Sequence, residues 1–345
     1  MSVKPTIENV AQLAHVSKAT VSRVMNNHPS VLPDTRERVW EVIRSLNYEP
    51  NRLARSLSTN DGFRAILVVY THSSNEAVDN PYFSNIVNAI ATVAERYEYE
   101  LILHSGNDEN AEIEKALSMT NSKMIRGILL LSSRTNSKFV QAISKTNVPM
   151  VIVGQRDPAI KASNIISVDT DNYRDSWEIA EYLVQRGHTR FGCIHAPGHY
   201  YVAIDRVRGF RDGLSKYGFE LPQNCCLNGG YTLESSYKAA LELLCSQKVS
   251  AIFATDDLKA LGVYKAAQNL QLRIPDDISV VGHNDFEYSA LLNPPLTTVR
   301  VPIYELGVMS ASKLLAMIEN QSHECSQMLS TELVVRNSVR SFPKE

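Results

Sequence analysis

Short apolar runs that alternate with longer helical patterns constrain the fold of this 345-residue chain more than any other feature. The runs AILVVY (65–70), ELILHS (100–105) and GILLLS (127–132) precede helical patterns near 83–97, 110–121 and 136–146, and MVIVG (150–154) follows. Strands that are buried on both faces read as continuous apolar runs, and the connecting helices cover the sheet. The alternation therefore predicts an α/β fold built on parallel sheets.

The same cycle then restarts. Helices are expected near 172–186, 203–217, 234–246 and 257–270, and strands at 191–196, 225–229, 251–255 and 278–283. The repeated pattern therefore predicts two doubly wound units of about 100–130 residues each, a length within the usual range for a domain. Ligands of such sheets bind at the carboxyl ends of the strands. Two facing units therefore predict a cleft for a small molecule.

Residues 1–50 have a different pattern, which predicts three short helices. Thr6 can cap the first helix and Ser17 the second, because their side-chain oxygens accept hydrogen bonds from the unpaired N–H groups of a first turn. Asp34 followed by Glu37 resembles a capping box for the third helix. Pro50 ends this unit.

Charge is distributed unevenly between this unit and the rest of the chain. Residues 1–64 hold nine Lys/Arg and six Asp/Glu, a net charge of +3, whereas the remaining 26 bases and 31 acids give −5. A basic unit on an acidic body predicts attraction to a polyanion at one end of the protein. An uneven scatter of surface charge would give the same totals.

The first two helices fit a helix-turn-helix, whose second helix enters the DNA major groove with its N-terminal residues at base edges. Lys18 can reach a guanine, Ala19 a thymine methyl group, and Arg23 a base or a phosphate. Short donors suited to phosphates are Ser17, Thr20 and Ser22. The alternative is a small helical bundle with solvated charges.

Several classes of protein do not fit the sequence. The five cysteines are scattered without a C-x-x-C pair, so we expect neither a metal site nor a redox dithiol, and free thiols suit a reducing cytoplasm. We see no apolar signal core and no apolar run near the ~20 residues that span a bilayer. G-x-G-x-x-G, P-loop and G-x-S-x-G motifs are absent, so we expect no cofactor and no enzyme activity.

Several motifs in a consistent order carry a family resemblance. The stretch TIENVAQLAHVSKATVSRVMN followed by NYEPNRLARSL resembles the DNA-binding head and hinge of the LacI/GalR family of bacterial repressors. The similarity includes VDTDN (168–172), DRVRGF (205–210), TDDLKALG (255–262) and ISVVGHNDFE (278–287). It implies a helix-turn-helix head at 1–50 and a hinge helix with its linker at 51–62. It also implies two α/β subdomains of the periplasmic-binding-protein type, at 63–165 plus 299–326 and at 166–298 plus 327–342.

The resemblance implies a homodimer on a palindromic operator in double-stranded DNA, because one head and one hinge cannot read both half-sites. In the family, paired hinge helices enter the minor groove, and a leucine matched here by Leu57 wedges between base steps. The expected DNA-binding residues are Thr6, Ser17, Lys18, Ala19, Thr20, Ser22, Arg23, Asn26, Asn51, Arg52, Ala54, Arg55 and Leu57.

The resemblance also implies an effector pocket between the two subdomains. Arg206 matches the family's pocket arginine, which can form paired hydrogen bonds with hydroxyl groups or a carboxylate. Asp256 matches a polar pocket position, and several aromatic residues match positions that wall a sugar ring. The expected effector-binding residues are Tyr82, Phe83, Arg134, Tyr200, Arg206, Tyr231, Asp256 and Asn284.

The chain departs from the family's usual pattern at four positions. After VVG the family usually has an aromatic residue and an effector-binding aspartate, where this chain has His283 and Asn284. An amide both donates and accepts hydrogen bonds, which argues against an ammonium-bearing effector and leaves neutral, hydroxyl-rich ligands open. Asp175 and His15 stand where the family commonly has glycine. A left-handed backbone at His15 would cost about 1–2 kcal/mol, although histidine tolerates it better than most residues.

These features predict a cytoplasmic, ligand-controlled transcriptional regulator, most simply a repressor of sugar-use genes. NPYF (80–83) and SGNDEN (105–110) resemble the maltose-type repressors of the family and point to an α-glucoside or a related oligosaccharide. The alternative is a sugar-binding transport-type protein without a regulatory role.

Overall fold

The computed structural model describes residues 5–25, 28–48, 64–70, 80–106, 108–320 and 324–342. The chain forms two compact units, a head (Met1–Phe63) and a body (Arg64–Glu345). In the part of the chain that is described, no helix combines the length and the apolar character needed to cross a membrane. The predicted DNA-binding residues that lie outside the described residues are Asn26, Asn51, Arg52, Ala54, Arg55 and Leu57.

The head contains three helices around a small apolar core. They are α1 (Ile7–Leu13), α2 (Lys18–Met25) and α3 (Pro33–Ser45). Val10, Val21, Val24 and Val39 are fully buried between them. Each helix contributes at least one of these valines to the same core cluster, so the three short helices are stabilised by their shared packing rather than singly.

The start of α3 corrects the predicted capping box. The helix begins at Pro33, and its N-cap Leu32 makes no side-chain cap hydrogen bond. Proline is preset for the first helical position and needs no N–H partner there, so the helix starts before Asp34. Asp34 lies instead in the first turn, where the helix dipole favours an acidic side chain.

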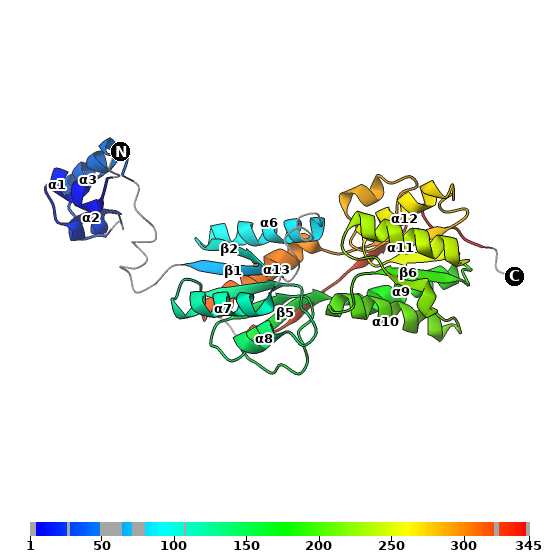
Figure 1. The fold of residues 1–345 in the computed structure, drawn as a ribbon. Helices are drawn as coiled ribbons and strands as arrows, with labels where there is room; N and C mark the ends of the chain where they lie inside the picture. The colour runs from blue at the N-terminus through cyan, green and yellow to red at the C-terminus, as the bar shows by residue number, and fades with distance from the viewer. Residues whose placement is uncertain are drawn as a thin grey trace. The chain divides into compact units, whose positions relative to one another are not determined.

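The first sheet of the body has six parallel strands in the order β11-β5-β4-β3-β1-β2. The strands are β1 (Ala65–Tyr70), β2 (Glu100–Ser105), β3 (Gly127–Leu131), β4 (Met150–Val153), β5 (Ile165–Thr170) and β11 (Gln327–Leu329). Its helices are α6 (Pro81–Arg96), α7 (Glu109–Asn121), α8 (Lys138–Ile143) and α13 (Ile303–Ile318). The helices pack in pairs, α6 with α13 and α7 with α8 (Figure 1), which gives the doubly wound arrangement expected from the sequence.

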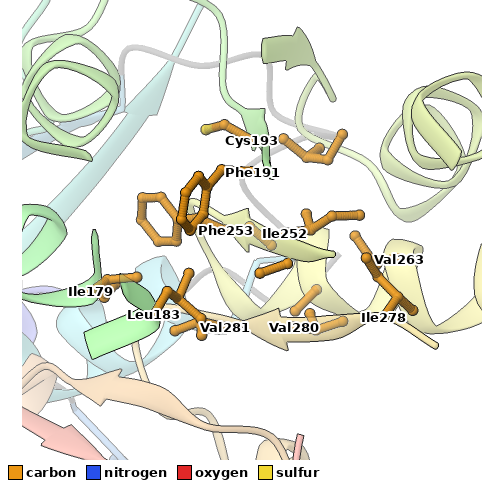
Figure 2. Close-up of a cluster of buried hydrophobic side chains, with 14 of the residues drawn as sticks. Ile179, Leu183, Phe191, Cys193, Ile252, Phe253, Val263, Ile278, Val280 and Val281 are labelled. Carbon is orange, nitrogen blue, oxygen red and sulfur yellow. The ribbon is translucent and has the colours of Figure 1, made fainter. Parts of the chain in front are cut away.

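The second sheet has four parallel strands in the order β7-β6-β8-β9. They are β6 (Phe191–His195), β7 (Cys226–Asn228), β8 (Ala251–Ala254) and β9 (Ser279–Val281). Its helices are α9 (Asn172–Gln185), α10 (Tyr201–Lys216), α11 (Leu233–Ser246) and α12 (Asp257–Asn269), with short 3-10 helices at Gln223–Cys225 and Glu287–Ala290. Figure 2 shows its core, where Phe191 and Phe253 from the sheet lie near Ile179 and Leu183 from α9.

Sheet membership differs from the sequence-based subdomain ranges at two strands. Residues 165–170 (β5) and 327–329 (β11) pair with each other and with β4 in the six-stranded sheet, whereas the ranges place 166–170 and 327–329 in the second subdomain. After β11, the chain forms a separate two-stranded sheet, in which β12 (Glu332–Val334) pairs antiparallel with β10 (Thr298–Arg300). The chain therefore leaves the six-stranded sheet after β5, returns to it with β11 and leaves it again before β12, because strand pairing and not sequence order defines each layer.

Candidate functional site

The turn between α1 and α2 positions the exposed start of α2. The Oγ of Ser17 accepts a hydrogen bond from the backbone N–H of Thr20 at 3.1 Å, which confirms the predicted cap. His15 has φ +50°, the left-handed conformation that the sequence predicted at this turn. The Oγ1 of Thr6 caps α1 in the same way, through the N–H of Asn9.

The predicted base-reading side chains lie on the outer surface of α2. Lys18, Ala19 and Arg23 are exposed, whereas Val21 and Val24 point into the head core. Lys18 forms an ion pair with Glu8 of α1, and both side chains are more than half exposed. An exposed pair of this kind is weak, so a stronger acceptor such as a guanine edge or a phosphate can take over the ammonium group.

The body contains a pocket at the carboxyl ends of its strands, as expected for such sheets. Ser132 follows β3, Gly154 follows β4, and Thr255 follows β8. The predicted effector residues that line this pocket are Tyr82, Phe83, Arg206, Tyr231, Asp256 and Asn284. The structure therefore brings six of the eight predicted residues together, although they are distributed over about 200 positions of the sequence.

Arg206 extends from α10 and is almost fully buried. Its Nε donates to the Oδ1 of Asn172 at 2.8 Å, its Nη1 donates to the backbone carbonyl of Thr255, and its Nη2 lies 3.5 Å from the Oδ1 of Asn284. Burial lowers the pKa of this guanidinium. These three contacts leave two of its five N–H bonds for a ligand.

Asp256 caps α12 and is already paired with a cation. Its Oδ1 accepts the backbone N–H of Lys259 at 2.8 Å, and its Oδ2 accepts from the Lys259 ammonium at 2.6 Å. Burial opposes ionisation of Asp256, but the neighbouring ammonium outweighs it, and the pKa of the carboxyl falls. Lys259 is 1% exposed, so this pair is a buried, locally neutral unit in which Asp256 is part of the pocket wall.

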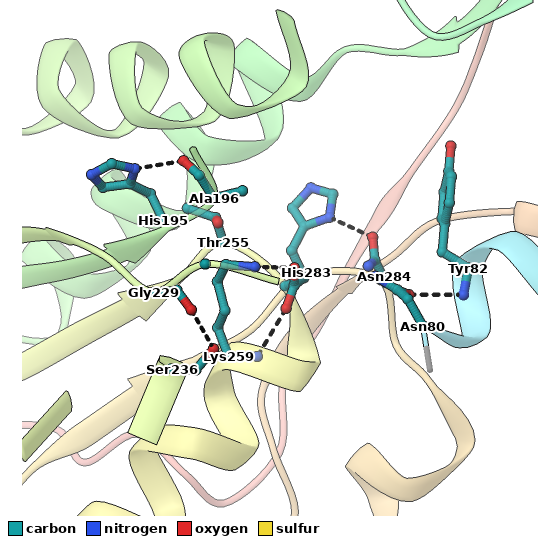
Figure 3. Close-up of polar contacts among 12 residues, drawn as sticks. Asn80, Tyr82, His195, Ala196, Gly229, Ser236, Thr255, Lys259, His283 and Asn284 are labelled. Carbon is teal, nitrogen blue, oxygen red and sulfur yellow. Dashed lines mark hydrogen bonds and ion pairs between the residues drawn. The ribbon is translucent and has the colours of Figure 1, made fainter. Parts of the chain in front are cut away.

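The three body positions that depart from the family pattern contact one another. The Nδ1 of His283 lies 3.3 Å from the Oδ1 of Asn284, and its Nε2 lies 3.2 Å from the Oδ2 of Asp175 (Figure 3 shows the first contact). The hydroxyl of Thr331 donates to the Oδ1 of Asp175. His283 is fully buried, so it is a hydrogen-bonded structural residue that joins the pocket to the segment between β11 and β12.

Aromatic side chains form the opposite wall. The rings of Tyr82 and Phe83 lie edge to face with centroids 5.5 Å apart, at the start of α6. Asn80 caps this helix through a 3.0 Å hydrogen bond from the N–H of Tyr82, also seen in Figure 3. Tyr231, between β7 and α11, adds a third ring, whose centroid lies 5.9 Å from the Nζ of Lys259. Such ring faces and edges suit the apolar side of a sugar.

Arg134 and Tyr200, also predicted to bind the effector, lie outside the lining of this pocket. The Nε of Arg134 donates to the hydroxyl of Tyr200 at 3.2 Å, and a backbone bridge joins the two residues. The guanidinium also faces the Tyr200 ring at 5.7 Å. Their side chains are hydrogen-bonded to each other because the chain after β3 and the loop before α10 meet at this point.

Sequence reasoning missed several polar lining residues, among them Asp169, Asn172 and Thr255. The motif VDTDN contains the first two, and their position at the end of β5 was the available signal. Asn172 donates to the Oδ1 of Asp169 at 3.2 Å and accepts from Arg206. Burial raises the pKa of Asp169 to about 7, so this carboxyl is only partly ionised at neutral pH.

Comparisons with known proteins agree along the whole chain. Residues 6–51 match the family "Bacterial regulatory proteins, lacI family", and residues 180–339 match a periplasmic binding protein-like domain. The chain is 32% identical over 340 residues to the HTH-type transcriptional repressor PurR of Aliivibrio fischeri, which covers 97% of this chain and 98% of that protein.

Two solved structures extend the likeness to the fold. A transcriptional regulator CelR–cellobiose complex has a TM-score of 0.73 and 29% identity, and the match covers 97% of this chain and 99% of that chain. The lac repressor dimer bound to operator and the anti-inducer ONPF has a TM-score of 0.86 and 26% identity, with 98% and 100% covered. The chain therefore belongs to the LacI family of bacterial regulatory proteins and is a DNA-binding transcriptional regulator, not an enzyme.

Proposed function

We propose that this chain represses carbohydrate-use genes in the cytoplasm and that a small sugar-like effector in the body pocket controls its binding to DNA. The pocket's composition carries the proposal: aromatic rings come from α6, and hydrogen-bonding groups come from α10 and the ends of β5 and β8. A ligand there contacts both sheets' elements, so its binding is coupled to their arrangement. The cellobiose in the CelR complex supports a sugar as the ligand class.

The proposed DNA-reading surface is the exposed side of α2 with the residues that precede it. Two heads (1–50) of a homodimer would read the half-sites of a palindromic operator, and two hinge segments (51–62) would enter the minor groove between them. The operator-bound lac repressor dimer supports this arrangement. By linkage, effector and operator then change each other's affinity by the same factor.

The test measures operator affinity in the presence and absence of sugars. An operator is selected from a random palindromic library with the full chain, and binding is followed by fluorescence anisotropy at several salt concentrations. We expect salt-sensitive binding and a change in affinity with at least one saccharide. Arg206→Ala should abolish the saccharide effect, because it removes the donor that connects Asn172, Thr255 and the ligand.

Arg211→Ala is the matched control, because Arg211 lies on the same helix but is exposed and does not line the pocket. It should respond to saccharide as the unaltered chain does. A normal saccharide response in Arg206→Ala would show that the pocket is assigned wrongly. Absence of salt-sensitive operator binding by the full chain would refute the repressor itself.

A further inference from the structure

The buried guanidinium of Arg206 contacts only neutral groups among the described residues. Its three acceptors are the side-chain amides of Asn172 and Asn284 and one backbone carbonyl. No carboxylate of the described residues lies within ion-pair distance of it. Asp256, Asp175 and Asp169 act on this cation only at longer range. A buried cation gains from a directly hydrogen-bonded anion, so this end of the pocket favours a ligand that supplies a negative charge.

The nearest carboxylates are engaged elsewhere or only partly charged. Asp256 is neutralised by the Lys259 ammonium at 2.6 Å. Asp175 is held by His283 and by the hydroxyl of Thr331, on the far side of the imidazole from Asn284. Asp169 accepts two hydrogen bonds on one oxygen, and burial raises its pKa to about 7. These acids therefore stabilise the charge of Arg206 from a distance, but none of them accepts a hydrogen bond from its guanidinium.

The orientation of the Asn284 amide follows from its neighbours. Arg206 carries only donors, so the Asn284 atom that faces it is the carbonyl oxygen. The Nδ1 of His283 lies 3.3 Å from the same oxygen, and the Nε2 of His283 lies 3.2 Å from the Oδ2 of Asp175. Both contacts described for this side chain use Oδ1, so its NH2 group is left to donate into the pocket that Asn284 lines.

Together these groups form a donor-rich end of the pocket. Arg206 and Asn284 are 7% and 5% exposed, and both present N–H groups with no carboxylate between them. We propose that this end binds a carboxylate and that the effector is a sugar acid, an aldonate or a uronate. His283 and Asp175 are positioning residues that hold the Asn284 amide in its donating orientation. This inference rests on the proposed effector pocket and names its ligand class.

The remainder of the pocket fits the other half of such a ligand. The second oxygen of Asp169 can accept a hydrogen bond from a sugar hydroxyl, because its described hydrogen bonds both use Oδ1. The rings of Tyr82, Phe83 and Tyr231 can cover the apolar side of the carbon skeleton. A carboxylate that forms charge-assisted hydrogen bonds with Arg206 and Asn284 is held more strongly than a neutral hydroxyl at the same place.

The test compares matched acids and neutral sugars on the full chain by isothermal titration calorimetry at fixed ionic strength. The pairs are D-gluconate with D-glucitol, D-glucuronate with D-glucose, and D-galacturonate with D-galactose. We expect at least one acid to bind about tenfold or more tightly than its neutral partner, a difference of about 1.4 kcal/mol. The proposal is overturned if no acid exceeds its partner, whether the neutral sugars bind or all six probes fail.

Asn284→Asp supplies the missing carboxylate and should reduce the preference for the acid at least tenfold, because Arg206 then has an ionic partner in the protein. Asn224→Asp is the matched control, since Asn224 is exposed and lies outside the pocket lining.

His283→Phe should lower the ratio of acid affinity to neutral-sugar affinity without abolishing binding of the neutral sugar. A purely structural role of His283 would not give this result. Thermal unfolding checks that each variant folds.

Operator binding measured in the same preparation separates the two proposals. If a neutral sugar binds and changes operator affinity while no acid does, the regulatory function stands and the sugar-acid assignment fails. If an acid binds in calorimetry but the chain does not bind operator DNA, the regulatory function fails and the assignment stands.

Discussion

Gly209→Ala should destabilise the body and impair its pocket, although alanine is the better helix former. Gly209 lies on α10, three residues after Arg206. A Cβ at this position would be 2.1 Å from the backbone oxygen of Tyr173 and 2.9 Å from its carbonyl carbon. A normal C···O contact is about 3.3 Å or more, so α10 and α9 must separate by roughly 1 Å. Backbone atoms cannot rotate away, and the strain therefore falls on the helix packing.

Two effects set the magnitude. Alanine in an open helix position gains about 1 kcal/mol over glycine, and overpacking a close contact costs typically about 1–3 kcal/mol. The shortness of the contact with Tyr173 places the cost at the upper end, so we expect a net loss of about 1–2 kcal/mol. In a unit of this size, that loss lowers the Tm by about 2–8 °C. The same retreat of α10 would stretch the 2.8 Å hydrogen bond from Arg206 to Asn172 and weaken the effector response.

Thermal unfolding of the full chain measures the first effect, and effector-dependent operator binding measures the second. Gly198→Ala is the control, because a Cβ there would meet nothing within 4 Å. It should leave both properties unchanged. A Gly209→Ala chain as stable as the unaltered one, or more stable, would refute the packing argument. Lower stability with a normal effector response would refute only the link to Arg206.

Three further predictions follow from single residues. Lys18→Ala should relax operator preference at one base pair by about 1–3 kcal/mol, measured by competition among operator variants, and unchanged preference would exclude Lys18 as a base reader. His15→Gly should slow hydrogen exchange in the head by stabilising it up to about 1 kcal/mol, since φ is +50° there, and faster exchange would contradict this. Burial lowers the pKa of His188 to about 4. As the pH is lowered from 6.5 to about 4, His188 is therefore protonated in the unfolded chain but not in the folded chain. The free energy of unfolding should decrease over this range by up to about 3 kcal/mol. His188→Gln should remove that part of the pH dependence in urea unfolding, and identical pH profiles would contradict the assignment.

Much of the fold was predictable because it depends on local patterns. The apolar runs at 65–70, 127–132 and 251–255 contain β1, β3 and β8, and the helical patterns at 83–97 and 257–270 match α6 and α12 to within two residues at each end. Burial on both faces of a parallel strand is visible in the sequence as an uninterrupted apolar run. The cap at Ser17 and the left-handed His15 were equally local, because each depends on neighbours within a few residues.

The structure also differs from the sequence-based expectations in places, for local reasons. The pattern Asp34-x-x-Glu37 looked like a capping box, but Pro33 moved the start of the helix. Arg134 and Tyr200 have the right side chains for a pocket wall, but in the structure they contact each other and lie outside the pocket lining. A motif can state which residue types are present, but the partner that each one reaches depends on the path of the backbone.

The sequence by itself determined the parallel α/β body, the helix-turn-helix head and the side of the sheets where a ligand binds, since these follow from periodicity and strand direction. Only the tertiary structure decided the chemistry of the pocket. Asp175 and His283 are 108 residues apart, and each read alone as an isolated departure from a family pattern. Their contact, together with the amide of Asn284, sets which group faces Arg206. The electrostatic environment of a ligand depends on which charged and polar groups lie near it, and folding decides which remote residues come close together.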